Sequence, residues 1–439
     1  MRLHTLLVIS SSLVLQTALV HAQTSDSKTT AQAESSANSQ LISLDDAIRQ
    51  TLNRSSRLKS GQENVSAARG ERLQSSLLPN PELAAEAENI FGSNGASGLS
   101  EAEITLGGEQ LIELGGKRAA RIEAANSKLT IADLQYTATA LDLIQNTTNA
   151  WVEAVAATED LKLAQSQHEI ASDVLKSVSK RVSAAAEPAI QKSKSQVALA
   201  SSRIAQQKAE RNLEMALKTL TGMWGEDASA YELDKSDFFV KEKPQFEPEP
   251  SVSSNPDVQL LEAGVKAANA VLGVEKSNAV PDLSVGIGVK RSRETDSQAL
   301  VTGLSIPIPV YNRNQGSIMR AGHEAAMAEY DKSSGLRAIN MELLQARNTI
   351  ETSWLELQTL ENEIIPVAQK AFSQANDGYR AGKFPYLDVL DAQRTLSEVR
   401  IQRIATLREY HHARAELDRL TGENIKYLSP DGEANDNAQ

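Results

Sequence analysis

Three short markers occur twice in this chain, in the same order and at the same spacing of about 200 residues. The pairs are Pro81-Glu82-Leu83 with Pro281-Asp282-Leu283, Gly116 with Gly316, and Leu220-Thr221-Gly222 with Leu420-Thr421-Gly422. One short match in an alanine-rich sequence occurs easily by chance, but an ordered series at constant spacing does not. We therefore predict an internal duplication, with residues 41–222 and 255–422 as two copies of one structural unit.

Each copy is predicted to contain a helix, two extended segments, a long helix, a turn and a returning helix. The first long helix follows Gly116 and contains no proline up to Val182, whereas the second is interrupted only by Pro366. The returning helices are expected at about residues 188–220 and 385–420. At 1.5 Å per residue, a helix of about 60 residues is on the order of 90 Å long. Helices of that length must pair side by side, within one chain or between copies.

The extended segments alternate apolar and polar residues with a period of two, which is typical of strands. In the second copy the alternation runs through Leu283, Ser284, Val285, Gly286, Ile287, Gly288, Val289 and Lys290. We expect one β-hairpin at about residues 81–112 and another at about 281–309. Periodicity alone favours a sheet packed on the helices. The alternative is a set of strands that cross a lipid bilayer. Four strands are too few to close a barrel, and an open edge is not stable in lipid, so several copies must then share one barrel.

The N-terminal segment has the layout of a cleaved secretory signal. Residues 1–22 combine Arg2 near the start, an apolar stretch and a small-residue end. A membrane anchor is the alternative, but Gln16 and several serines interrupt the apolar stretch. No later segment is apolar for 18 consecutive residues, so we expect no transmembrane helix. The remaining segments are a disordered lead-in at 23–40, a proline-containing connector at 223–254 and a C-terminal tail at 423–439.

The composition excludes several classes of protein. None of the 439 residues is cysteine, so disulfides, thiolate metal sites and cysteine nucleophiles are ruled out. The formal net charge of −12 argues against a nucleic-acid partner, which needs a basic face. No Ser/His/Asp arrangement, phosphate-binding loop or metalloprotease motif is present, and the adjacent His411 and His412 point in different directions on a helix. We expect no enzyme, no cofactor and no metal site.

Three longer motifs carry a family resemblance. They are residues 78–83 (LPNPEL) with 113–118 (ELGGKR), residues 306–316 (IPIPVYNRNQG), and residues 379–393, which contain YRAG and LDVLDAQ. Over about residues 41–422, the chain resembles the outer-membrane efflux channels of the TolC family. Within that family it is most similar to the heavy-metal-efflux branch, typified by the outer-membrane subunit of the cobalt–zinc–cadmium system.

The resemblance implies a mainly α fold with a small β part, in a homotrimer. Each protomer gives four strands to a shared 12-stranded outer-membrane β-barrel and its long coiled-coil helices to a periplasmic α-barrel. The connector at 223–254 then belongs to an equatorial region. The implied partners are outer-membrane lipid, a periplasmic adaptor (membrane fusion protein) and a proton-driven inner-membrane pump of the RND type.

The implied function is a passive exit duct in the outer membrane of a Gram-negative bacterium, with metal cations as its cargo. The same duct could instead serve drugs or secreted substrates. A protein of another class, a water-soluble periplasmic coiled-coil scaffold, is the remaining alternative.

Carried over from the family motif, a closing gate near the helical tip involves Asp388, Asp391 and Tyr379. The aspartates are three residues apart and so share a helix face, and a ring of carboxylates favours cations. The alternative is an ordinary acidic first turn after Pro385. A basic gate residue of the best-known members falls where this chain has Phe384, so that latch is not expected here unless the adjacent lysine replaces it.

The tips of the two helical hairpins, residues 181–189 and 377–386, are the places where family members meet the adaptor. The candidate contact residues are Arg181, Glu187, Arg380, Gly382 and Lys383. An ordinary helix–helix turn explains the same residues, and both interpretations can hold together. On the strands, the polar face carries Glu86, Glu88, Glu101 and Glu103. We predict that these carboxylates line the barrel lumen, either as a cation-friendly exit or simply as its wetted wall.

Overall fold

The computed structural model describes residues 40–91, 99–226, 231–240, 242–246 and 255–428. The predicted signal at 1–22 lies outside these residues, as do all but the last residue of the predicted lead-in and the end of the C-terminal tail. The expectations for those segments therefore remain predictions.

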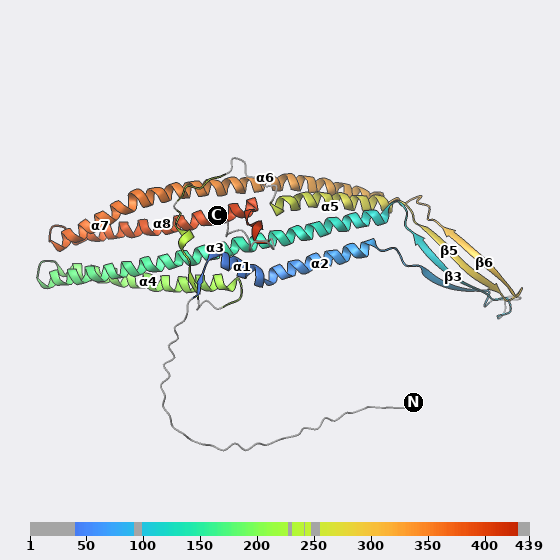
Figure 1. The fold of residues 1–439 in the computed structure, drawn as a ribbon, viewed down its shortest axis with the longest axis horizontal. Coiled ribbons are helices and arrows are strands. Elements are labelled where there is room, and N and C mark those ends of the chain that lie inside the picture. The colour runs from blue at the N-terminus through green and yellow to red at the C-terminus, as the bar shows by residue number, and fades with distance from the viewer. Residues whose placement is uncertain (1–39, 92–98, 227–230, 241, 247–254, 429–439) are drawn as a thin grey trace, which may run out of the picture. The chain divides into compact units, whose positions relative to one another are not determined.

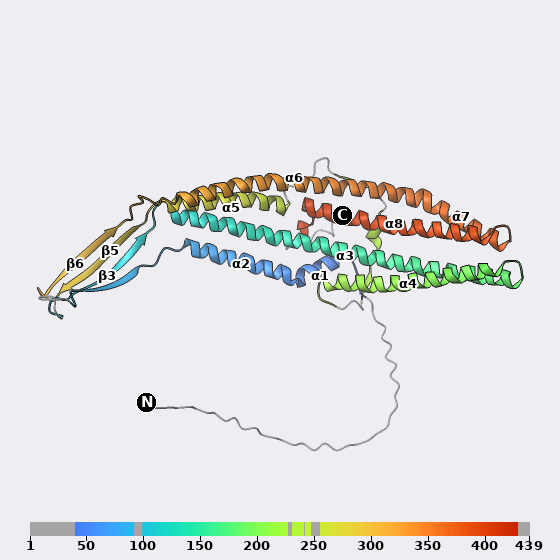
Figure 2. The same ribbon diagram turned by 180° about the vertical axis from the view of Figure 1, so that it is seen from behind.

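Long helices run side by side through the helical part of the chain. The helices are α1 (Leu44–Arg54), α2 (Ser56–Ser76), α3 (Lys117–Ser183), α4 (Ala189–Gly222), α5 (Pro256–Asn278), α6 (Gln315–Thr359), α7 (Ile365–Arg380) and α8 (Tyr386–Thr421). Figures 1 and 2 show α2 and α5 beside the sheet-proximal half of α3 and α6, and α4 and α8 beside the other half. The order helix, hairpin, long helix, returning helix occurs twice, so the predicted duplication is confirmed.

A capped break divides the first predicted helix into α1 and α2. Ser43 caps the start of α1: its hydroxyl accepts the backbone N–H of Asp46 at 3.2 Å, and the carboxylate of Asp46 accepts the N–H of Ser43 at 3.2 Å. The single continuous helix is wrong, because Ser55 adopts an extended conformation and its hydroxyl accepts the N–H of Leu58.

The second long helix contains a π-helical turn at Leu360–Ile364 and then continues as α7 to Arg380. Pro366 is the second residue after this turn. Proline has no N–H to donate, and its ring collides with the carbonyl group four residues earlier in a regular α-helix. A wider turn relieves that collision without ending the helix. The predicted interruption at Pro366 is thus confirmed, and the irregular turn precedes the proline.

One four-stranded antiparallel sheet has the order β2-β3-β5-β6. Its strands are β2 (Glu82–Glu88), β3 (Glu103–Ile112), β5 (Leu283–Ser292) and β6 (Ser297–Ser305). Both predicted hairpins are therefore present, and β3 of the first copy pairs with β5 of the second. In Figures 1 and 2 the sheet extends past the ends of the helices and no helix lies across either face. The expectation of a sheet packed on the helices is wrong.

The main hydrophobic core lies midway along the helices, where the connector crosses them. Trp151, Leu220, Trp224, Phe238 and Ile350 are all buried there. In the connector, β4 (Tyr231–Leu233) pairs in parallel with β1 (Gln40–Ile42), and a 3₁₀ turn follows at Ser236–Phe238. Residue 40 was expected in the disordered lead-in but belongs to β1, because the connector supplies its pairing partner.

The described start of the C-terminal tail is also ordered. It forms a 3₁₀ helix at Glu423–Leu428, and Ile425 and Tyr427 pack against the small core of α1 and α3.

None of the helices in the described part of the chain is both long enough and apolar enough to span a membrane.

Candidate functional site

The four-stranded sheet exposes one apolar face. The register places Ala85, Leu106, Val289 and Leu300 in one row across the four strands. Leu106 is 56% exposed and Leu300 69% exposed, and Leu83, Ile287 and Leu304 on the same face are exposed as well. A contiguous exposed apolar surface of this kind marks a contact with another protein or with lipid.

The two outer strands of the sheet, β2 and β6, have free edges. Each edge presents unpaired backbone N–H and C=O groups, and no further strand lies beside either one among the described residues. β3 and β5 have 10 residues each, which at about 3.3 Å per residue gives roughly 30 Å and is enough for a tilted strand to cross a bilayer. Such edges are unstable in lipid, so the isolated sheet is an incomplete structure.

The opposite face of the sheet is polar. Glu86 and Glu88 on β2 share it with Glu103 on β3, and Lys290 on β5 pairs with both Glu88 (2.8 Å) and Glu103. The prediction that these three glutamates lie on one strand face is confirmed in its geometry. Glu101 instead lies in the turn before β3, because the strand begins two residues later.

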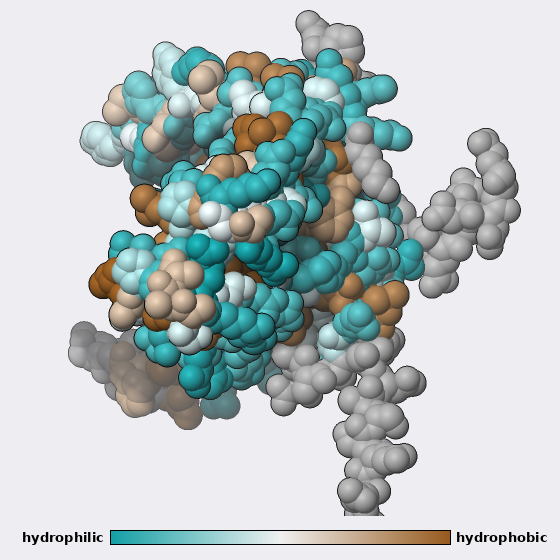
Figure 3. Space-filling model, turned by 90° about the vertical axis from the view of Figure 1, so that its left-hand side faces the viewer, coloured by the Kyte–Doolittle hydropathy of each residue, from teal (hydrophilic) through white to brown (hydrophobic). Residues whose placement is uncertain are grey.

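The opposite end of the helices is formed by two hairpin turns that pack together. The α3–α4 turn covers residues 184–188 and the α7–α8 turn residues 381–385. A small hydrophobic core joins them, and its buried members are Val174, Val178, Ala375, Tyr379, Tyr386 and Val389. Viewed from this end, the surface is mainly hydrophilic with separate apolar patches (Figure 3).

The predicted gate residues are not brought together within one protomer. Asp388 and Asp391 are exposed on α8, whereas Tyr379 is buried against Tyr386, with ring centroids 5.8 Å apart. Burial raises the pKa of Tyr379 above its usual value and raises the pKa of Tyr386 to about 12. The phenolic oxygens of both tyrosines are buried without a hydrogen-bond partner in the described structure. Of the three predicted gate residues, only Asp388 and Asp391 are therefore exposed and could face the symmetry axis of an oligomer.

The turn residues divide into a buried and an exposed set. Arg181 and Glu187 form an ion pair at 3.5 Å and are largely buried, whereas Arg380 and Lys383 are exposed. Gly382 has φ of +73°, in the left-handed region that suits glycine.

Phe384, where the sequence resemblance led us to expect no basic latch residue, packs against Gly378. A Cβ atom on Gly378 would lie 2.1 Å from the Phe384 ring, so the ring rests directly on the glycine.

His411 and His412 are engaged in structural contacts. His411 Nε2 lies 2.8 Å from the carbonyl oxygen of Phe238, whereas His412 lies 2.8 Å from Asn149 and 2.9 Å from Glu153. Burial lowers the pKa of His411. The described residues contain no group of three or more His, Asp or Glu side chains arranged to hold a metal ion.

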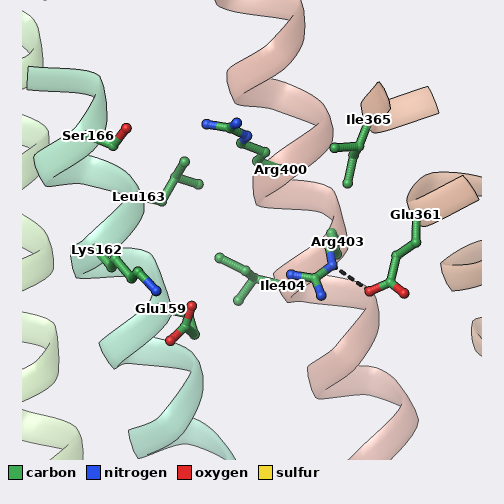
Figure 4. Close-up of a pocket in the computed structure, with 9 residues that line it drawn as sticks. All are labelled: Glu159, Lys162, Leu163, Ser166, Glu361, Ile365, Arg400, Arg403 and Ile404. Carbon is green, nitrogen blue, oxygen red and sulfur yellow. Dashed lines mark hydrogen bonds and ion pairs between the residues drawn. The ribbon is translucent and has the colours of Figure 1, made fainter. Parts of the chain in front are cut away.

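A groove of about 500 Å³ lies between α3 and α8, beside the π-helical turn (Figure 4). Arg403 Nε donates to Glu361 at 2.6 Å, and Glu159 pairs with Lys235 at 3.1 Å. The two carboxylates that line the groove, Glu159 and Glu361, are thus already paired with cations. Lys162 and Arg400 add further positive charge to the groove. The groove therefore offers no free carboxylate ligands to a metal cation.

The family model described as "Outer membrane efflux protein" matches residues 47–226 and 249–423. The chain belongs to this family of outer-membrane efflux channels, and the two consecutive matches coincide with the duplication.

Individual relatives agree with the family assignment. The cobalt-zinc-cadmium resistance protein CzcC of Cupriavidus metallidurans is 30% identical over 87% of this chain and 90% of its own. The pyoverdine export outer membrane protein OpmQ of Pseudomonas aeruginosa is 24% identical over 73% of this chain and 72% of its own. Among solved structures, the outer-membrane channel OprN superposes with a TM-score of 0.76 at 18% identity, covering 86% of this chain and 89% of that one. CusC gives 0.73 at 17% identity, covering 86% and 91%. The TolC-type channel fold expected from the sequence is confirmed.

Proposed function

We propose that this protein is the outer-membrane exit duct of a tripartite efflux system and that it conducts heavy-metal cations. The observation that carries the proposal is the sheet: an exposed apolar face, a polar face and two free edges, on a chain that belongs to the outer-membrane efflux family. Lipid covers the apolar face, and further copies of the chain complete the edges. The protein acts as a passive channel and not as an enzyme.

Three copies supply the missing strands. Each chain contributes four strands, so a homotrimer forms a closed 12-stranded barrel in which β6 of one protomer pairs with β2 of the next. The polar face, with Glu86, Glu88 and Glu103, then lines the lumen. The helices form the periplasmic part below it, and the two hairpin turns form its far tip.

The tip carries the closing gate and the contact surface for the adaptor. Around a threefold axis, Asp388 and Asp391 form rings of carboxylates that slow anions and attract cations. Tyr379 supports the tip from inside the protomer. The exposed Arg380 and Lys383, beside Gly382, face the periplasmic adaptor, which in turn connects the duct to an inner-membrane pump of the RND type.

Metal cations are favoured as cargo by the likeness to a cobalt-zinc-cadmium resistance protein across most of both chains. The carboxylates of the lumen and the tip suit a path that attracts cations but binds none of them tightly. The choice among metal cations is then made by the pump and not by this channel. A second candidate, export of an organic compound, rests on the likeness to a pyoverdine export protein.

The test is deletion and complementation of the gene in a Gram-negative host. We expect deletion to lower tolerance of cobalt, zinc or cadmium, the wild-type gene to restore it, and the mature chain to fractionate with the outer membrane. Unchanged metal tolerance with reduced tolerance of organic compounds would transfer the proposal to the second candidate. Recovery of a monomer from the soluble periplasm would exclude a channel altogether.

A further inference from the structure

The link between β6 and α6 is an exposed apolar segment that contains two prolines (Figure 1). We call residues 306–311 (IPIPVY) the proline strap. Within it Ile308 is 80% exposed and Tyr311 91% exposed, and Ile306 and Val310 are exposed as well. A run of exposed apolar side chains marks a surface that another molecule covers.

The backbone of the proline strap is suited to an apolar surrounding. Pro307 and Pro309 have no N–H group that could be left unpaired. The carbonyl of Pro309 accepts a hydrogen bond from Arg313 Nε at 3.2 Å, and that of Tyr311 accepts one from Gln315 Nε2 at 3.2 Å. An irregular segment with few unpaired polar groups costs less free energy to place at the edge of a bilayer.

The apolar part of the sheet face is short for a bilayer. On β5 it runs from Leu283 to Val289, and at the end away from the helices it is bounded by Arg291, which lies opposite Gln298 on β6. Six residue steps of about 3.3 Å, on a strand tilted by about 40°, give a height of roughly 15 Å. The apolar band of an outer-membrane barrel is about 25 Å tall, so roughly 10 Å is missing at the end nearer the helices.

The proline strap supplies this missing height. Beyond Leu304 on β6, every second residue is again apolar: Ile306, Ile308 and Val310. A residue that precedes a proline is held in an extended conformation, so the strap advances by about 3.1 Å per residue. Five steps from the end of β6 at Ser305 give roughly 15 Å, or about 12 Å of height at the same tilt.

A neighbouring copy of the chain is the other candidate to cover the strap. In the proposed barrel β6 pairs with β2 of the next copy, and β2 is itself preceded by Pro79 and Pro81. Prolines therefore end the pairing on both edges at the end nearer the helices, since they have no N–H to donate. The seam between copies stops above the strap, and its side chains remain available to lipid. Tyr311, with an apolar ring and a polar hydroxyl, has the chemistry preferred at a membrane–water boundary.

We propose that the proline strap is a lipid-binding surface, in which Ile308 and Val310 contact the acyl chains of the inner leaflet of the outer membrane and Tyr311 lies among the phospholipid headgroups. The inference rests on the proposed channel function and deepens it by identifying where the bilayer ends on the protein. Three straps, one from each copy, then fix the depth of the channel in the membrane.

The experiment uses fluorescence quenching in the full-length channel. The chain contains no cysteine, so a single introduced thiol can be labelled with an NBD fluorophore without background. Ile308→Cys is labelled and reconstituted into phosphatidylcholine liposomes whose acyl chains carry nitroxide quenchers. We expect it to lose as large a fraction of its fluorescence as labelled Leu304→Cys on the apolar face of β6. The matched control is Ser305→Cys, which is adjacent in sequence but lies on the polar face and should not be quenched.

The outcomes separate the strap from the channel. If the probe at Ile308 stays bright while the probe at Leu304 is quenched, the lipid-binding role is overturned and the channel stands. Crosslinking between copies that carry both Leu78→Cys and Ile308→Cys would then assign the strap to the interface between copies. If neither the Leu304 nor the Ile308 probe is quenched, the sheet does not face lipid and the proposed function itself fails.

Discussion

A charge placed on the apolar face of the sheet tests the membrane assignment quantitatively. Leu106 lies near the middle of β3, and its neighbours in the row are Ala85 and Val289. An arginine near the bilayer midplane of a β-barrel costs about 2–4 kcal/mol on the lipid face. In a trimer the change occurs three times, so Leu106→Arg is expected to destabilise the assembly by roughly 6–12 kcal/mol.

The matched control is Thr105→Arg. Thr105 is the adjacent residue on the opposite face, where it lies between Glu86 and Lys290, so the same side chain enters at the same depth but points into water. We expect this variant to keep normal amounts of trimer, with a cost within about 0.5 kcal/mol.

The assay is outer-membrane fractionation followed by gel electrophoresis without boiling, which separates assembled trimer from monomer. Leu106→Arg should give little or no trimer. If both variants assembled equally well, the apolar face would be in contact with water and not with lipid.

Three further predictions follow from the tip and the helix caps. Asp388→Asn combined with Asp391→Asn should weaken block of the channel by multivalent cations in planar bilayers, because the carboxylate rings lose their charge; unchanged block would leave these residues as an ordinary helix start. The folded-state pKa of Tyr386 is raised to about 12, so the folded protein keeps this proton to higher pH than the unfolded chain, and stability should fall as pH rises from the usual tyrosine pKa of about 10. Tyr386→Phe should reduce that loss in thermal unfolding measured across this range, and an identical pH profile would contradict it. Ser55→Ala should cost about 1 kcal/mol by removing the cap of α2, measured as a lower unfolding temperature, whereas Ser56→Ala at the exposed neighbouring position should not.

The regular elements were predictable because their patterns depend on local sequence. The alternation through Leu283 and Lys290 identifies β5, and the absence of proline after Gly116 allows the 67-residue α3. The break at Ser55 was not predicted, since serine is common inside alanine-rich helices and its capping role depends on backbone angles. The pairing of β1 with β4 joins segments far apart in sequence, and no local pattern encodes it.

At the tip, too, the sequence predicted local features but not the packing between helices. The spacing of Asp388 and Asp391 placed them correctly on one exposed face of α8. The burial of Tyr379 away from them could not be inferred from the motif, because it depends on how α7 packs against α3. Arg181 and Glu187 were predicted to contact the adaptor, and their ion pair and partial burial could not be inferred from the motif, because they depend on how the two hairpin turns pack together.

The proposed channel requires that the four strands of one chain be part of a barrel completed by other copies. The most direct test is an electron cryo-microscopy map of the detergent-extracted protein, resolved well enough to trace the strand edges. We expect three chains, with β6 of each hydrogen-bonded to β2 of its neighbour around a closed wall whose leucines face detergent. A single chain whose sheet keeps both edges free, or folds its leucines back onto its own helices, would contradict it.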